Sequence, residues 1–95
     1  MAVYAVVQVD VHDATEYAKY AELAGPAVTQ YGGTFLARGG AVAVMEGTTR
    51  ARCVIVQFPD METAKRFYHS PEYQKALSYA LPCSDRDYKL VEGLD

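Results

Sequence analysis

Apolar and polar residues alternate along the first stretch of the chain, from Ala2 to Val11. The odd-numbered positions from Val3 onward are all apolar, whereas the even-numbered ones include Gln8 and Asp10. A period of two residues is that of a strand, whose successive side chains point to opposite faces of a sheet. The stretch therefore predicts a first strand.

The apolar period lengthens to three and four residues after Asp13, a residue type that caps helices. The apolar stripe consists of Tyr17, Tyr20, Ala21, Ala24, Val28 and Tyr31. Gly25-Pro26 predicts a kink or a short break, because Pro26 lacks the backbone donor that continues a helix. Gly32-Gly33 predicts the helix end, with one glycine in the left-handed conformation.

Strand-like stretches return after this helix. Thr34 to Arg38 predicts a second strand, and Ala41 to Glu46 a third extended segment, joined through Gly39-Gly40 as a turn or bulge. Arg52 to Phe58 is β-branched and aromatic, which predicts a strand that ends before Pro59.

Two helical stretches follow this central strand. Asp60 can cap the first, whose apolar positions are Met61, Ala64, Phe67 and Tyr68. Ser70-Pro71-Glu72 predicts a new helix start, with Ser at the cap and Pro in the first turn. Pro82 to Arg86 is then expected to be a loop, and Asp87 to Glu92 the last strand.

The order of these elements is β-α-β(β)-β-α-α-β within one domain of residues 1–95. It predicts an α+β fold, a ferredoxin-like antiparallel sheet with its helices on one face. The first and central strands are apolar on both faces, yet the helices can cover only one of them. A second copy of the sheet is the simplest cover for the other face, so we expect a homodimer.

Composition narrows the classes of partner. The net charge is −3 and the nine basic residues are scattered, whereas a nucleic-acid interface needs a basic stripe. No apolar run approaches the roughly 20 residues that span a bilayer, and the N-terminus lacks the basic flank of a signal peptide. Cys53 and Cys83 could form a disulfide, but the sequence has no small secreted cysteine framework that demands one. We therefore expect a cytoplasmic protein without nucleic-acid or membrane partners.

Eight tyrosines and no tryptophan make phenol groups the chain's most prominent chemistry. Tyr17, Tyr20, Tyr68 and Tyr73 fall on predicted helix faces. Core packing with the hydroxyls at the surface is one interpretation. A ligand pocket between helices and sheet, lined by these rings, is the other.

Two arginines and two histidines are further candidates. Arg38 and Arg52 are either solvated strand ends or donors that bind a ligand carboxylate or enolate through a planar guanidinium. His69 is either exposed or a general base beside Tyr68, because histidine titrates near neutral pH. His12 and His69 show no ligand spacing, so no metal or haem site is expected.

The motifs FPD and FYHSPEYQ, at residues 58–60 and 67–74, resemble the signature of the domain-of-unknown-function 1330 family. The resemblance extends over nearly the whole chain through Asp13-x-x-x-Tyr17-x-x-Tyr20, Tyr31-Gly32-Gly33, Arg38-Gly39-Gly40, Glu46-Gly47 and Val91-Glu92-Gly93. It implies that the sheet dimerises into the α+β barrel of that superfamily. It also implies the reaction types of related families, which are isomerisation, cyclisation and oxygenation without a cofactor.

Two positions depart from the family pattern. Gln57 stands where the family typically has Glu, and Ala80 stands where Arg is usual. We expect the two positions to lie close together, with an ion pair replaced by neutral residues, because losing one partner alone would leave an uncompensated charge.

The resulting hypothesis is a small homodimer that binds an apolar or aromatic organic molecule in a helix–sheet cleft. Its ligand-binding residues would be Tyr17, Tyr20, Arg38, Arg52 and Tyr73. As an enzyme it would act without cofactor or metal, with Tyr68 and His69 as catalytic residues. The alternative is a non-catalytic ligand-binding or accessory protein. The sequence does not identify the ligand.

Overall fold

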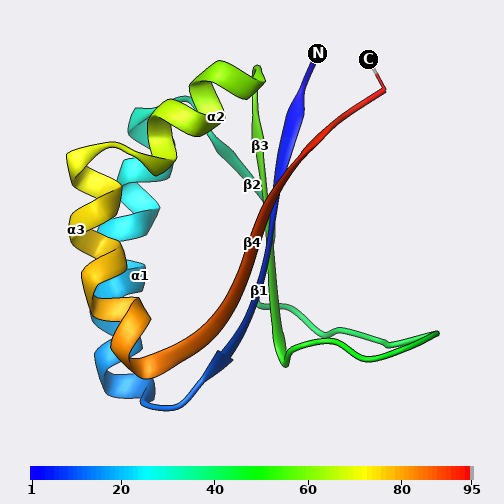
Figure 1. The fold of residues 1–95 in the computed structure, drawn as a ribbon, viewed down its shortest axis with the longest axis vertical. Coiled ribbons are helices and arrows are strands. Elements are labelled where there is room, and N and C mark those ends of the chain that lie inside the picture. The colour runs from blue at the N-terminus through cyan, green and yellow to red at the C-terminus, as the bar shows by residue number, and fades with distance from the viewer. Residues whose placement is uncertain (95) are drawn as a thin grey trace.

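The computed structural model describes residues 1–94 as two layers, a sheet and a set of helices that all lie on one side of it (Figure 1). In chain order the elements are β1 (Val3–Val11), α1 (Ala14–Gln30), β2 (Thr34–Arg38), β3 (Arg52–Phe58), α2 (Met61–Tyr68), α3 (Pro71–Ala80), a 3-10 turn (Leu81–Cys83) and β4 (Ser84–Glu92).

The sheet has the strand order β2-β3-β1-β4, and each neighbouring pair is antiparallel. β1 is therefore central and pairs along its length with β4, from Val3 opposite Glu92 to Val11 opposite Ser84. This is the ferredoxin-like arrangement that the order of elements predicts, and the prediction is confirmed.

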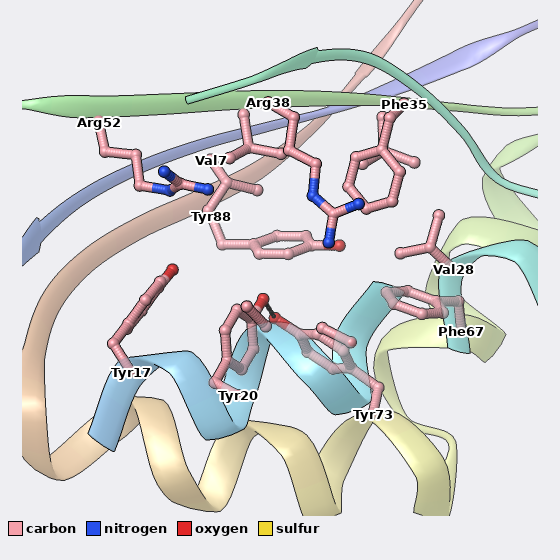
Figure 2. Close-up of a pocket in the computed structure, with 14 residues that line it drawn as sticks. Val7, Tyr17, Tyr20, Val28, Phe35, Arg38, Arg52, Phe67, Tyr73 and Tyr88 are labelled. Carbon is pink, nitrogen blue, oxygen red and sulfur yellow. Dashed lines mark hydrogen bonds between the residues drawn. The ribbon is translucent and has the colours of Figure 1, made fainter. Parts of the chain in front are cut away.

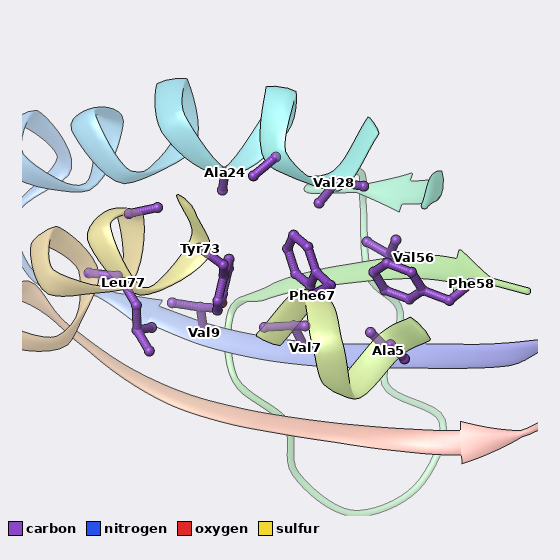
Figure 3. Close-up of a cluster of buried hydrophobic side chains, with 14 of the residues drawn as sticks. Ala5, Val7, Val9, Ala24, Val28, Val56, Phe58, Phe67, Tyr73 and Leu77 are labelled. Atoms are coloured by element: carbon purple, nitrogen blue, oxygen red, sulfur yellow. The ribbon is translucent and has the colours of Figure 1, made fainter. Parts of the chain in front are cut away.

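The alternation in β1 separates the core from the second face of the sheet. Val3, Ala5, Val7 and Val9 are buried under the helices (Figure 3). The rings of Phe58, Phe67 and Tyr73 cross the core, with Phe67 centred 5.2 Å from Phe58 and 4.6 Å from Tyr73. Truncating such a ring to alanine costs about 3–5 kcal/mol, so this row ties α2 and α3 to the sheet.

All three helices begin at the predicted caps. Asp13 accepts hydrogen bonds from the backbone of Thr15 and Glu16, and Asp60 accepts one from Thr63 at 2.7 Å. Ser70 Oγ accepts from the backbone N–H of Tyr73 at 3.2 Å. Each bond satisfies a donor that the first helical turn would leave free, worth about 1 kcal/mol.

The predicted third segment, Ala41 to Glu46, is wrong as a strand. Residues 39–51 form an irregular connection that leaves the sheet on the side opposite the helices (Figure 1). Gly39 and Gly47 have φ values of 72° and 76°, which turn the backbone out of the extended conformation. Val42, Val44 and Met45 are exposed as a result, and Met45 is 88% exposed.

Two smaller predictions also need correction. β4 begins at Ser84 rather than Asp87, because residues 84–86 continue the ladder with β1. α1 is not broken at Gly25-Pro26 and runs to Gln30. The helix ends as predicted, with Gly32 in the left-handed region at φ 82°.

The expectation that Gln57 and Ala80 lie close together is wrong. Gln57 pairs with Tyr4 at one end of β1, whereas the carbonyl of Ala80 accepts a hydrogen bond from Ser84, which pairs with Val11 at the other end. The seven residue-to-residue steps from Tyr4 to Val11 span roughly 23 Å of strand. The two departures from the family pattern are therefore independent.

The sheet face turned away from the helices, here called the open face, carries apolar side chains at its centre. Val6 of β1 lies opposite Ile55 of β3, and Tyr4 lies opposite Val91 of β4. Arg50 binds Asp10 and Asp87 at distances of 3.0 and 2.8 Å toward one end of this face. Within residues 1–94, no helix is long and apolar enough to cross a membrane.

Candidate functional site

A cleft opens between α1 and the helix-facing side of the sheet (Figure 2). Its cavity volume is about 50 Å³. Its walls come from every strand and helix: Val7, Tyr17, Tyr20, Ala21, Ala24, Val28, Phe35, Arg38, Arg52, Val54, Val56, Phe67, Tyr73 and Tyr88. A mostly apolar lining with a few convergent polar groups is typical of sites for small organic molecules.

Three tyrosines form the helical wall. Tyr17 and Tyr20 lie one turn apart on α1, so their rings share a face of the helix, with centroids 5.1 Å apart. Tyr73 of α3 meets Tyr20 edge to face at 6.0 Å, and their hydroxyl oxygens lie 3.0 Å apart. Figure 2 shows the three hydroxyls pointing from the helices toward the sheet.

Arg86 of β4 donates hydrogen bonds to all three of these hydroxyls. Its Nη2 donates hydrogen bonds to Tyr20 and Tyr73 at 3.1 and 3.0 Å, and its Nη1 donates to Tyr17 at 3.4 Å. The guanidinium also lies 4.6 Å from the ring centre of Tyr20. All three oxygens therefore act as acceptors toward Arg86, which leaves their hydrogens for the Tyr20–Tyr73 bond and for groups in the cleft.

Burial keeps these phenols protonated. It raises the pKa of Tyr73 and of Tyr88 well above the ordinary value, and raises that of Tyr17 as well. Nearby Arg86 acts in the opposite direction in all three cases but does not outweigh burial. At neutral pH Tyr17, Tyr73 and Tyr88 therefore present hydroxyl donors and no tyrosinate base.

Arg38 and Arg52 line the opposite wall, where both side chains reach from the sheet into the cleft (Figure 2). Arg38 lies 4.2 Å from the ring centre of Phe35. Arg52 pairs across β1 and β3 with Val9, which also pairs with Arg86. Arg52 and Arg86 thus lie on either side of the buried Val9, on the same face of the sheet. Their backbones are two strand spacings, or about 10 Å, apart.

No carboxylate of residues 1–94 lies within 4.0 Å of Arg38, Arg52 or Arg86. Arg50, by contrast, binds two aspartates on the open face. The Nε of Arg52 is buried and has no hydrogen-bond partner within the described part of the chain. A buried donor without a partner is rare and costs about 1–3 kcal/mol, so its presence inside a cleft marks a place for a ligand atom.

The structure brings together five of the residues predicted from the sequence, Tyr17, Tyr20, Arg38, Arg52 and Tyr73, in this one cleft. The two predicted catalytic residues lie beside it. Tyr68 and His69 line a second, more open hollow with Lys65, Tyr88 and Leu90, whose volume of about 190 Å³ exceeds that of the cleft. His69 is exposed, whereas the Tyr68 ring contacts both Tyr73 and Tyr88, so it forms a partition between the two hollows. The roles of all seven remain predictions.

Sequence reasoning missed Arg86 and Tyr88. Both were assigned to a loop or a plain strand, although Arg86, Tyr88 and Leu90 alternate with acidic and basic residues. That period of two was the available signal, and it would have placed all three side chains on the helix-facing side of β4. Arg86 is the more important omission, because it contacts all three tyrosines of the helical wall.

The residues give little support to metal or thiol chemistry. No group of three metal-ligating side chains gathers anywhere in residues 1–94. Cys83 is buried, its sulfur donates to the carbonyl of Tyr79 at 3.2 Å, and burial raises the pKa of its thiol. Such a cysteine is inert, because the thiolate is the reactive form.

Comparison with known proteins places the chain in a family. Residues 2–94 match the family model described as "Domain of unknown function (DUF1330)". The chain belongs to this family. The resemblance carried by the FPD and FYHSPEYQ motifs is thereby confirmed. No curated protein matches the sequence.

Solved structures show the same fold at low sequence identity. A protein of unknown function from Rhodopseudomonas palustris superposes with a TM-score of 0.79 at 16% identity, over 99% of this chain and 83% of that one. A dimeric ferredoxin-like protein of unknown function from Jannaschia sp. CCS1 gives 0.71 at 14%, over 98% and 100%. SnoaB, a cofactor-independent oxygenase from Streptomyces nogalater, gives 0.67 at 12%, over 99% and 94%. This member of the DUF1330 family thus shares its architecture with dimeric ferredoxin-like proteins.

Proposed function

We propose that this DUF1330 protein is a homodimer whose subunits each bind a small, largely apolar or aromatic organic molecule in the cleft between α1 and the sheet. The observation that carries the proposal is the cleft itself, which combines aromatic and aliphatic walls with hydrogen-bond donors at its polar end. Side chains arranged only for core packing would close over this space, because protein interiors are normally packed without such voids.

The open face supports the dimer. Val6 and Ile55 lie opposite each other at its centre, without a helix over them, and an antiparallel sheet exposed to water would carry polar residues there. The projecting residues 39–51 leave the sheet on this side, so they can reach around a second copy (Figure 1). The fold is shared with proteins described as dimeric.

The proposal requires only that the cleft binds the ligand. As an enzyme, the protein would also convert the bound ligand. None of the cleft-lining residues is a carboxylate or a histidine, and its phenols stay protonated. An isomerisation, cyclisation or oxygenation there would therefore begin from a ligand that ionises readily, with Tyr68 and His69, which line the neighbouring hollow, as the proposed proton-transfer pair. The shared fold with a cofactor-independent oxygenase supports this form by likeness of architecture only.

The test uses two tryptophan substitutions on α1. Ala21 lines the cleft, whereas Ala18 is exposed on another face of the same helix. Saturation-transfer NMR with a set of small aromatic compounds should detect binding to the wild-type protein and to Ala18→Trp. Ala21→Trp, which fills the cleft, should abolish that binding. Equal binding to both variants would place the ligand elsewhere and contradict the proposal.

A further inference from the structure

The cleft offers hydrogen-bond donors at every polar position. The guanidinium groups of Arg38 and Arg52 line the cleft, and that of Arg86, which also comes from the sheet, donates to the tyrosine hydroxyls of the helical wall. Guanidinium groups have no acceptor atoms. The hydroxyl oxygens already accept from Arg86, which leaves their hydrogens to point outward. A ligand that fits these groups must bring acceptors.

The positive charge of the arginines also favours a ligand with acceptor atoms, and in particular an anionic one. The guanidinium groups of Arg38 and Arg52 line the cleft, and that of Arg86 lies behind its tyrosine hydroxyls, although the whole chain has a net charge of −3. Arginine stays protonated at all ordinary pH values, so these charges cannot be removed by deprotonation. Partly buried cations without an anionic partner are costly, and within residues 1–94 neither Arg52 nor Arg86, both partly buried, has one. Arg38 is exposed and also lacks an anionic partner within the described residues.

Two glycines leave room for the guanidinium groups. A side chain at Gly39 would occupy the position of the Arg52 guanidinium, and a Cβ at Gly25 would come within 3.0 Å of Arg38 Nη2. Gly39 therefore lets the partly buried Arg52 side chain fold over the cleft, and Gly25 lets the exposed Arg38 side chain approach α1. Close packing of this kind holds the charges in place before a ligand arrives, which lowers the entropic cost of binding.

We propose that the ligand of this cleft is an organic anion, a planar or aromatic molecule carrying a carboxylate or an ionised enol. This inference rests on the proposed function and specifies its ligand class. The charged oxygens lie between Arg52, whose buried Nε lacks a partner, and the hydroxyls of Tyr17 and Tyr20 that Arg86 polarises. Arg38 supplies a second guanidinium at the mouth.

The apolar walls decide between an organic anion and a simple inorganic one. Beyond the donors, the cleft is lined by Val28, Phe35, Val54, Val56 and Phe67. A ring seated against these side chains gains the free energy of apolar burial, which phosphate or sulfate would not. A flat carboxylate also matches the fork of a guanidinium, which can donate two parallel hydrogen bonds to it.

The test compares isosteric probes that differ in charge. Benzoate and cinnamate would be titrated against benzamide and cinnamamide by NMR, up to about 10 mM, so that millimolar affinity registers. Wild-type protein should bind each carboxylate at least about tenfold more tightly than its amide, as expected for charge-assisted hydrogen bonds. Inorganic phosphate should compete weakly, because it makes no apolar contact.

Three variants test whether the preference for carboxylates depends on Arg52. Arg52→Gln should reduce the carboxylate preference to within about threefold, and Arg52→Lys should recover only part of it, because lysine lacks the planar fork. Arg66→Gln is the matched control, since Arg66 lies on α2 outside the cleft, and it should keep the full preference. The ratio of carboxylate to amide affinity is measured on the wild-type protein, so it does not depend on whether a variant folds.

The outcomes separate the two proposals. Equal affinity for carboxylates and amides, with both lost in Ala21→Trp, would overturn the anion inference and leave the cleft as a binding site. Phosphate binding as tightly as benzoate would also overturn it, because the apolar walls would then contribute nothing. No binding of any aromatic probe would contradict the proposed function as well.

Discussion

The guanidinium of Arg52 occupies the space that any side chain at position 39 would need, and Gly39 leaves that space free. Gly39 also has a φ of 72°, a conformation that residues with a Cβ rarely adopt. One glycine thus turns the chain at the end of β2 and allows an arginine from β3 to lie over the cleft. Position 39 therefore links the fold to the candidate site.

This relationship predicts that Gly39→Ala damages the site as well as the fold. The strained φ should cost about 1–2 kcal/mol of the free energy of unfolding. Displacement of Arg52 should in addition weaken benzoate binding about tenfold. Gly47→Ala is the matched control, because Gly47 has a φ of 76° but no atom near its would-be side chain. It should lose similar stability in urea unfolding and keep its affinity; equal affinity in both variants would contradict the account.

Arg86 should matter for stability as well as for binding. Arg86→Met removes the donor that serves Tyr17, Tyr20 and Tyr73, and leaves their hydroxyl oxygens without it in a poorly hydrated place. We expect a loss of about 1–3 kcal/mol in the free energy of unfolding. Arg66→Met, on the exposed side of α2, should change it by no more than about 0.5 kcal/mol. Equal effects would show that the tyrosine cluster does not depend on Arg86.

The buried phenols make stability fall on the alkaline side. Tyr73 and Tyr88 have a raised pKa in the folded protein, chiefly from burial, against an ordinary value of 10.0. Above pH 10 the unfolded chain therefore binds fewer protons than the folded one, and the free energy of unfolding decreases as pH rises. Below pH 10 this contribution is fully present and constant. Urea unfolding at a series of alkaline pH values should show the decline.

A double substitution tests the origin of that decline. Tyr73→Phe with Tyr88→Phe should flatten the alkaline slope. An unchanged slope in the double variant would mean that the cleft phenols are not the groups that titrate.

The open face predicts a dimer that a single charge disrupts. Light scattering after size exclusion should give about twice the 10.4 kDa of one chain. Val6→Asp would bury an unpaired carboxylate at the centre of the interface and should raise the dissociation constant roughly a hundredfold or more. Leu81→Asp makes the same change at an exposed position on the helical layer and should leave the dimer intact. A monomeric wild-type protein would contradict the interpretation of the open face.

Local periodicity was sufficient for most of the fold. The alternation in β1, the caps at Asp13, Asp60 and Ser70, and the turn at Gly32 all depend on neighbours within a few residues, and each was predicted correctly. The stripe on α1 also placed Tyr17 and Tyr20 on the face that lines the cleft.

The wrong or missing predictions all concern features that depend on residues far apart in the sequence. Ala41 to Glu46 is an apolar run of strand length but finds no neighbouring strand in residues 1–94, so it has no ladder to join. Arg86 belongs to a strand only because Ser84 continues the pairing with Val11 across the sheet. The expected proximity of Gln57 and Ala80 likewise rested on family pattern alone, which does not report distance in this fold.

The central claim is that a small organic molecule binds between α1 and the sheet, and the position of a bound probe tests it most directly. Amide and arginine-side-chain chemical shifts of labelled protein would be followed while benzoate is added. The account predicts the largest changes at Ala21, Ala24, Phe35 and Val54, together with the buried Nε–H of Arg52. Changes confined to the hollow beside His69 or to the open face, with Arg52 Nε–H unaffected, would contradict it.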